Sequence, residues 1–156
     1  MKLPKVEFGE VFQVSLSKGY GLIQCVKEAP KDKLEIIRAL PGIYGEEDLD
    51  KLHKIILLKE LFFLQLPVKY AIKQKLLKSL GKFPVPINSE APRYFRTEHM
   101  IGTEFICWHV VDSETLQIKS TKGLSPEEQK LSEWDVISIP DLAEKIESGW
   151  SPEVWK

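Results

Sequence analysis

Apolar and polar residues alternate along the amino-terminal third of the chain, and this pattern predicts strands. In residues 6–16 the even-numbered positions are mostly apolar, so their side chains share one face of a strand that is interrupted near Gly9. A turn at residues 17–19 precedes a second apolar run at residues 20–26, and together they predict a hairpin. Residues 34–40, after a polar loop, predict a third strand.

The clearest predicted helix covers residues 67–80. Pro67 suits the first turn of a helix, and Gly81 suits the position just past its end. Apolar residues recur there every four positions and form one stripe, which consists of Val68, Ile72, Leu76 and Leu80. The preceding run, residues 55–66, is apolar on both faces and predicts a buried strand, with a helix as the alternative.

The second half of the chain predicts another hairpin and two helix starts. Residues 105–111 predict a central strand, which turns into a partner at residues 116–119. Ser125 and Ser138 each begin a capping pattern, and Gly149 is placed to end the later helix. Because the strands come in local hairpins, we expect one α+β domain over residues 1–156. We expect this domain to contain a twisted, mostly antiparallel sheet with two or three packed helices. A small, partly closed barrel is the alternative form of the sheet.

Composition indicates a protein that stays in the cytoplasm. Two cysteines, Cys25 and Cys107, are too few for a disulfide framework, and their apolar neighbours predict buried free thiols. Free thiols persist in a reducing compartment. The start of the chain has no signal-peptide pattern, and the most apolar stretch, residues 55–68, is shorter than the ~20 residues of a membrane span.

Residues that could perform chemistry are few. Cys107 and His109 would share a strand face and form the best local pair of metal ligands, which Cys25 could join. No Cys-x-x-Cys or His-x-x-x-His spacing accompanies them, so an ordinary strand histidine is the preferred interpretation. Cys107 stands in an apolar run that does not activate a thiol. We therefore predict no enzyme activity, no metal and no cofactor.

The charge of −1 is distributed unevenly. Residues 1–50 carry −2, residues 51–97 carry +8, and residues 98–156 carry −7. Aromatic residues within acidic segments are typical of surfaces that bind basic proteins, although core packing is the alternative for Trp150. The predicted partner-binding residues are Glu46, Glu47, Asp48, Asp50, Glu147, Trp150, Glu153 and Trp155.

The basic middle segment supports a different hypothesis, a nucleic-acid-binding module. Its basis is the lysine side of the predicted helix 67–80, which carries Lys69, Lys73, Lys75 and Lys78. The stacking aromatics of single-strand binders do not interleave with these lysines, and a solvated helix face explains them equally.

The two ends of the chain resemble a family of bacterial polymorphic-toxin immunity proteins, the one numbered twenty-six. The resemblance rests on Gly9-Glu10-Val11-Phe12, on Gly19-Tyr20-Gly21, and on the closing segment Gly149-Trp150-Ser151-Pro152-Glu153. It implies stoichiometric inhibition of a cognate toxin, often a nuclease, inside the producing cell. The matching positions are strand, turn and helix-end residues, so the resemblance transfers no toxin-contacting residue.

Overall fold

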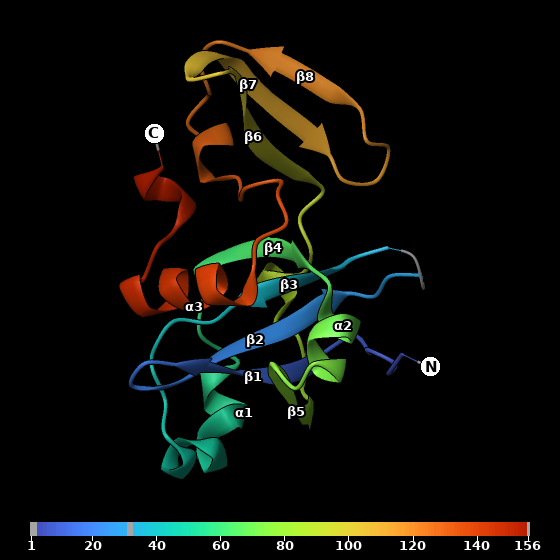
Figure 1. Ribbon diagram of the computed structural model, residues 1–156, viewed down its shortest axis with the longest axis vertical. Helices are drawn as coiled ribbons and strands as arrows, with labels where there is room; N and C mark the ends of the chain where they lie inside the picture. Colours follow the sequence, from blue (N-terminus) through green and yellow to red (C-terminus); the bar gives the residue numbers. More distant parts are fainter. Residues whose placement is uncertain (1–2, 31–32, 156) are drawn as a thin grey trace. The chain divides into compact units, whose positions relative to one another are not determined.

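The computed structural model describes residues 3–30 and 33–155 and forms two compact units (Figure 1). The first unit contains residues 1–91 and 136–150, and the second contains residues 92–135 and 151–156. The predicted α+β class is confirmed, since each unit contains an antiparallel sheet. The predicted single domain stays a prediction, because compact units also occur within one domain.

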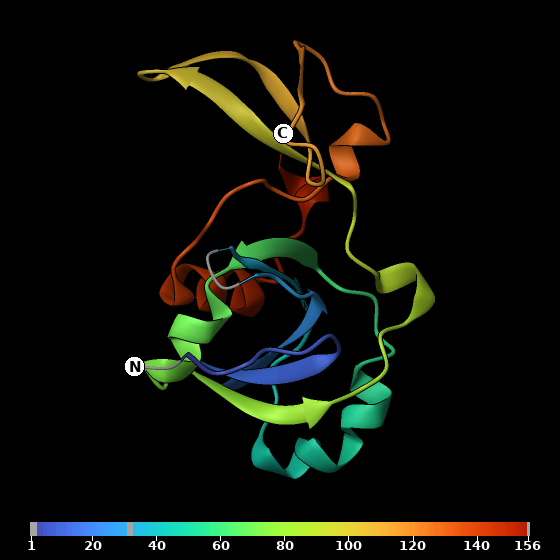
Figure 2. The same ribbon diagram turned by 90° about the vertical axis from the view of Figure 1, so that its right-hand side faces the viewer.

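The sheet of the first unit has five antiparallel strands in the order β4-β3-β2-β1-β5. These strands are β1 (Glu10–Leu16), β2 (Gly19–Lys27), β3 (Glu35–Ala39), β4 (Phe62–Leu66) and β5 (Leu77–Lys82). The sheet is twisted and curls (Figure 2), but no pairing between β4 and β5 closes it into a barrel among the residues described. The three strands predicted in the amino-terminal third of the chain are confirmed as β1, β2 and β3.

Two apolar clusters cover the two faces of this sheet. On one face, Phe12 and Ile23 pack with Leu142 of α3 (Ile139–Ser148) and Val68 of α2 (Val68–Lys73). The opposite face packs against α1 (Leu52–Ile55), which follows the 3-10 helix η1 (Glu46–Lys51). Cys25 belongs to the first cluster, and its burial raises the thiol pKa to about 12. The prediction of a buried free thiol is confirmed for Cys25.

A buried arginine links the strands of the first unit to the chain after α1. Arg38 Nε donates to Gln24 Oε1 at 2.8 Å, and its Nη2 donates to the carbonyl of Ile56 at 2.5 Å. Its Nη1 donates to the carbonyl of Leu58 at 3.1 Å and lies 3.5 Å from Glu60 Oε1. Burial lowers the pKa of Arg38, and the Glu60 carboxylate acts in the opposite direction.

The predicted helix over residues 67–80 is wrong in its second half. Helix α2 ends at Lys73, Lys75 has a positive φ of 62°, and β5 begins at Leu77. Pairing of β5 with β1 supplies the backbone of this segment with sheet hydrogen bonds and overrides its helix propensity. The predicted strand at residues 55–66 is likewise confirmed only at Phe62–Leu66.

Helix α3 confirms the capping signals near the end of the chain. Ser138 Oγ accepts a hydrogen bond from the Asp141 N–H at 3.2 Å, and Gly149 ends the helix with a φ of 68°. Its buried face, Leu142 and Ile146, packs on β1 and β2. Gly21 permits this approach, because a Cβ atom there would lie 3.1 Å from the Ile146 side chain.

The second unit holds an antiparallel sheet in the order β6-β7-β8. Its elements are β6 (Tyr94–Ile101), β7 (Glu104–Asp112) and β8 (Ile118–Thr121), with two 3-10 turns, η3 (Glu128–Lys130) and η4 (Pro152–Val154). The hairpin of β7 and β8 was predicted, whereas β6 was not. Ser125 and Glu128 form the expected reciprocal caps, with N···O distances of 2.9 and 3.2 Å, but only the single turn η3 follows instead of a helix.

Candidate functional site

The predicted partner-binding residues are divided between the two units. The acidic group at Glu46, Glu47, Asp48 and Asp50 lies in η1 of the first unit. Asp48 caps that turn, since Gly45 N–H donates to its carboxylate at 2.9 Å. Glu47 and Asp50 are exposed and remain available to a partner. Their predicted contact with a partner stays a prediction.

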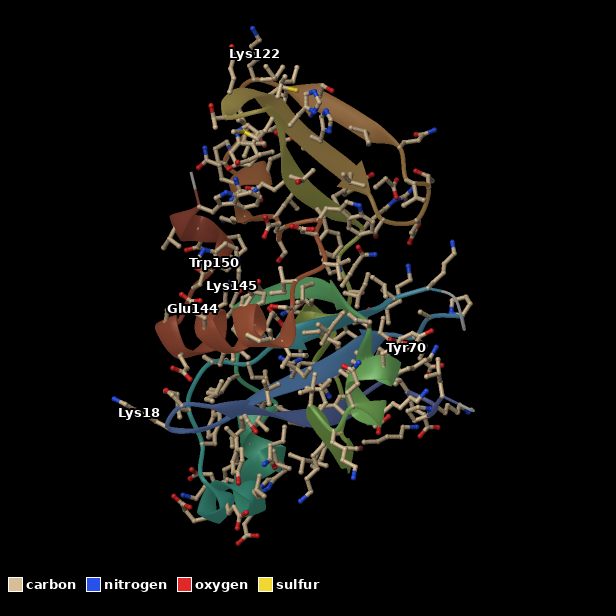
Figure 3. All side chains as sticks on the ribbon, in the orientation of Figure 1. Lys18, Tyr70, Lys122, Glu144, Lys145 and Trp150 are labelled. Carbon is tan, nitrogen blue, oxygen red and sulfur yellow. The ribbon has the colours of Figure 1, made fainter. Side chains whose placement is uncertain are left out.

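Glu147 and Trp150 both have internal roles in the first unit. Glu147 accepts hydrogen bonds from the Ser17 N–H at 2.5 Å and from Ser17 Oγ at 2.8 Å, which fastens the β1–β2 turn to α3. Trp150 packs edge-on against Phe62 with ring centroids 5.4 Å apart. Lys145 Nζ lies 3.6 Å from the Trp150 ring centroid, and Figure 3 shows both side chains near α3.

The hydrogen bonds between Ser17 and the Glu147 carboxylate should depend on pH. Hydrogen bonds from the backbone N–H and the hydroxyl of Ser17 lower the pKa of Glu147 in the folded protein. These bonds therefore stabilise the fold at pH values above the unfolded glutamate pKa of about 4.3. They are lost as the pH falls through the lower pKa of the folded state. We expect the Ser17 amide resonance to titrate with a midpoint below about 4.3 by NMR. Glu147→Gln should abolish that titration, whereas Glu144→Gln on the same helix should leave it unchanged; a midpoint at the ordinary glutamate value would contradict the contact.

Trp155 belongs to an aromatic corner in the second unit. Its Nε1 donates to Glu98 Oε1 at 2.9 Å, and its ring meets Trp108 edge-on with centroids 5.0 Å apart. The guanidinium of Arg96 lies 4.3 Å from the Trp155 ring centroid and 4.8 Å from that of Trp108. Glu153 lines a hollow of about 370 Å³ beside this corner.

Arg96 fastens the chain's last described residues to the sheet, a role that no pattern of neighbouring residues predicts. It is fully buried, and its Nη2 donates to the carbonyls of Gln129, Pro152 and Trp155 at 2.8–3.0 Å. Its Nε donates to the carbonyl of Leu131 at 3.1 Å. Arg96 is therefore a structural anchor within the second unit.

A larger groove lies on the same face of the three-stranded sheet. It has a volume of about 490 Å³ and is lined by Tyr94, Val110, Asp112, Gln117, Ile118, Lys119, Glu127, Glu128 and Leu131. Strand register brings these residues together, because Tyr94 lies opposite Asp112, and Val110 lies opposite Lys119. Residues around η3 form the remaining wall.

The groove combines an apolar surface with an acidic rim. Tyr94 is 46% exposed and Ile118 is 57% exposed, and both residues line the hollow. Glu127 is exposed at the rim and forms no ion pair within the described ranges. The second unit as a whole contains six lysines and arginines and nine acidic residues, a charge of −3.

Ion pairs fix the polar walls of the groove. Arg93 Nε lies 3.0 Å from Asp112 and 3.6 Å from Glu114. Partial burial acts to raise the pKa of Asp112, but N–H donors of the following turn and Arg93 together lower it. Lys119 Nζ lies 2.8 Å from Glu128, and this hydrogen bond holds the pKa of Glu128 below its usual value. The walls are therefore charged and ordered at neutral pH.

No known family provides independent support for a function. No family model, curated protein or solved structure matches this chain.

The candidate metal ligands Cys25, Cys107 and His109 are not all brought together. His99 and His109 stack with ring centroids 4.7 Å apart, and Cys107 lies opposite His99 in the strand register. Cys25 lies in the core of the first unit, so the predicted set is divided between units, and Cys107 is only half-buried. In residues 3–30 and 33–155 no three His, Cys, Asp or Glu side chains are grouped so that they could hold a metal ion.

The lysine helix of the nucleic-acid hypothesis forms only in its first half, as α2, which carries Lys69 and Lys73. Lys69 pairs with the buried Glu35 at 3.1 Å and donates to the carbonyl of Ala29 at 3.0 Å. Lys73 ends α2, and Lys78 lies on β5, an edge strand, where lysines discourage pairing with other chains. Within the described residues, no helix is both long and apolar enough to cross a membrane.

Proposed function

We propose that this chain is an immunity protein that neutralises a bacterial toxin by direct, stoichiometric protein–protein binding in the cytoplasm of the producing cell. The resemblance of its two ends to a toxin-immunity family motivates the proposal. The groove of the second unit is the structural observation that supports it, because exposed apolar side chains there flank an ordered, acidic wall. Such a combination suits a buried anchor surrounded by a polar rim.

The acidic charge of the second unit suits a basic partner. Nucleases bind a polyanion and present lysines and arginines around their substrate sites. A unit of charge −3 would attract such a surface during encounter, and the groove would take up an apolar side chain once the proteins have docked. We therefore place the centre of the interface at Tyr94, Ile118 and Glu127 rather than at the internally bonded Glu147 and Trp150.

Binding to the toxin encoded beside this chain's gene tests the proposal. Purified together, the two proteins should form a 1:1 complex by light scattering, and coexpression should restore growth to cells that make the toxin. Ile118→Asp combined with Glu127→Lys should weaken the complex about 100-fold or more, because it places a charge in the anchor position and reverses the rim.

A matched charge reversal separates the groove from the acidic turn of the first unit. Glu47→Lys with Asp50→Lys alters two exposed carboxylates of η1 and should change the affinity less than about threefold. The opposite ranking of the two variants would place the interface on η1. Absence of any complex with the neighbouring toxin would contradict the inhibitor function itself.

A further inference from the structure

The two edges of the second unit's sheet differ in how they are covered. Along β6, the Arg96 N–H donates to the Ser132 carbonyl at 2.9 Å, and the Trp134 N–H donates to the Arg96 carbonyl at 2.8 Å. Along β8, the only pairing found in the described part of the chain is with β7. Figure 1 shows β8 as the outermost strand of this sheet. One edge is therefore covered, and the other remains open.

The strand register identifies the backbone groups that face outward. Asp112 N–H donates to the Gln117 carbonyl at 2.9 Å, so this pair is hydrogen-bonded across the ladder. Because hydrogen-bonded and non-bonded pairs alternate in antiparallel sheets, Lys119 and Thr121 point their N–H and C=O groups toward β7. Ile118 and Ser120 point theirs away from the sheet.

This edge lacks the usual protection against pairing with another chain. Edge strands are commonly guarded by free lysines, prolines or bulges. The single lysine of β8, Lys119, is ion-paired with Glu128, and the strand contains no proline and no break in its register with β7. By contrast, β5 at an edge of the first sheet carries Lys78 and Lys82, which form no ion pair in the described part of the chain.

We propose that β8 binds its partner by strand addition: an extended basic segment of the bound toxin pairs with the Ile118–Thr121 edge and places one apolar side chain in the groove. This inference rests on the proposed function and specifies its binding mode. Ile118 and Lys119 belong both to the open strand and to the groove wall, so a paired segment passes directly beside the hollow. In strand addition, main-chain hydrogen bonds provide affinity, and pockets for alternate side chains provide specificity.

Charge selects the class of segment that fits. Glu127 is exposed at the rim of the groove, and the unit carries −3. Side chains of a paired strand point alternately to the two faces of the sheet, so an apolar residue that enters the groove leaves its neighbouring lysines on the other face. The charge of −3 on the unit attracts these lysines over a longer range. An acidic segment would meet repulsion at the same place.

A proline substitution separates strand addition from simple charge attraction. Ser120→Pro removes an outward N–H without removing a hydrogen bond to β7, so the sheet should form as before. Ser120→Ala keeps the N–H and is the matched control. The probe is the fluorescein-labelled peptide KVKLKVK, measured by fluorescence anisotropy with the full chain at low salt. Its affinity should fall about tenfold or more with Ser120→Pro and remain unchanged with Ser120→Ala.

Two further measurements keep the test decisive if the proline variant does not fold. KVKLKVK with an N-methylated central leucine, and the flexible peptide KGKGKGK, should both bind the native chain at least about tenfold more weakly than KVKLKVK. Hydrogen exchange should show new protection of the Ile118 and Ser120 amides in the complex. Equal binding of all three peptides, or of the native and Ser120→Pro chains, would overturn strand addition.

The outcomes for the toxin and for the peptide are independent. A toxin that binds 1:1 and tolerates Ser120→Pro in a folded chain refutes strand addition and leaves inhibition standing. Peptide binding with the expected pattern, but no toxin complex, supports strand addition and refutes the toxin as the partner.

Discussion

Replacing Arg38 with methionine is expected to lower the free energy of unfolding by about 3–5 kcal/mol, as is usual when one member of a buried ion pair is removed. Methionine fills much of the volume but donates no hydrogen bond. The Gln24 side chain and the carbonyls of Ile56 and Leu58 then lose their donor within the first unit. Glu60 keeps a buried charge without its counterion.

The matched control also removes the buried carboxylate of Glu60, which Arg38→Met leaves without a counterion. Arg38→Met combined with Glu60→Leu should recover part of the loss, because the buried carboxylate is gone and only the orphaned carbonyls remain. Urea unfolding followed by circular dichroism measures both variants against the native chain. A loss below about 1 kcal/mol for the single substitution would show that Arg38 is not needed to join the strands to the segment after α1.

The predictable part of the fold is the part decided by local pattern. β1 follows from partial alternation, and β2 and β3 follow from short apolar runs next to turns and polar loops. Helix α3 follows from Ser138, Gly149 and an apolar stripe, all of which lie within the helix or next to it. The signals that define these elements lie within the elements or next to them, so neighbouring residues are sufficient to predict them.

The errors occur where distant pairing overrides local preference. Residues 74–80 have a helical stripe, but β1 offers them a sheet edge, and Lys75 adopts a left-handed conformation to let the chain reverse. β6 was not predicted, because a charged residue, Arg96, occupies one of its buried positions. Its burial is possible only because carbonyls from residues 129–131 and 152–155 converge on it.

The candidate site shows the same limit. Segmental charge predicted an acidic surface with aromatic residues, and the second unit is acidic. The groove, however, draws residues from three strands and from η3, which only strand register brings together. Trp150 and Trp155 lie among acidic residues in the sequence, yet Trp150 packs on Phe62 and Trp155 packs on Trp108. Composition indicated the kind of surface but not its position.

Arg96→Met should destabilise the second unit by about 3–5 kcal/mol and release the segment after Ser151. Four carbonyls lose a charged donor, each worth about 1 kcal/mol or more, and Trp108 and Trp155 lose the cation between them. Tryptophan emission should shift to the red, and proteolysis should cut the chain near Pro152 faster than in the native protein.

Two arginine variants test whether the geometry or the charge of the Arg96 guanidinium holds the segment after Ser151. Arg96→Lys keeps the charge but cannot reach four carbonyls with one ammonium group, so it should recover only a small part of the lost stability. Arg93→Met removes a half-exposed arginine from surface ion pairs in the same sheet and should cost at most about 1 kcal/mol. If Arg96→Lys instead restored native stability and native resistance to proteolysis, charge alone would hold the segment, and the planar fork of the guanidinium would not be the anchor.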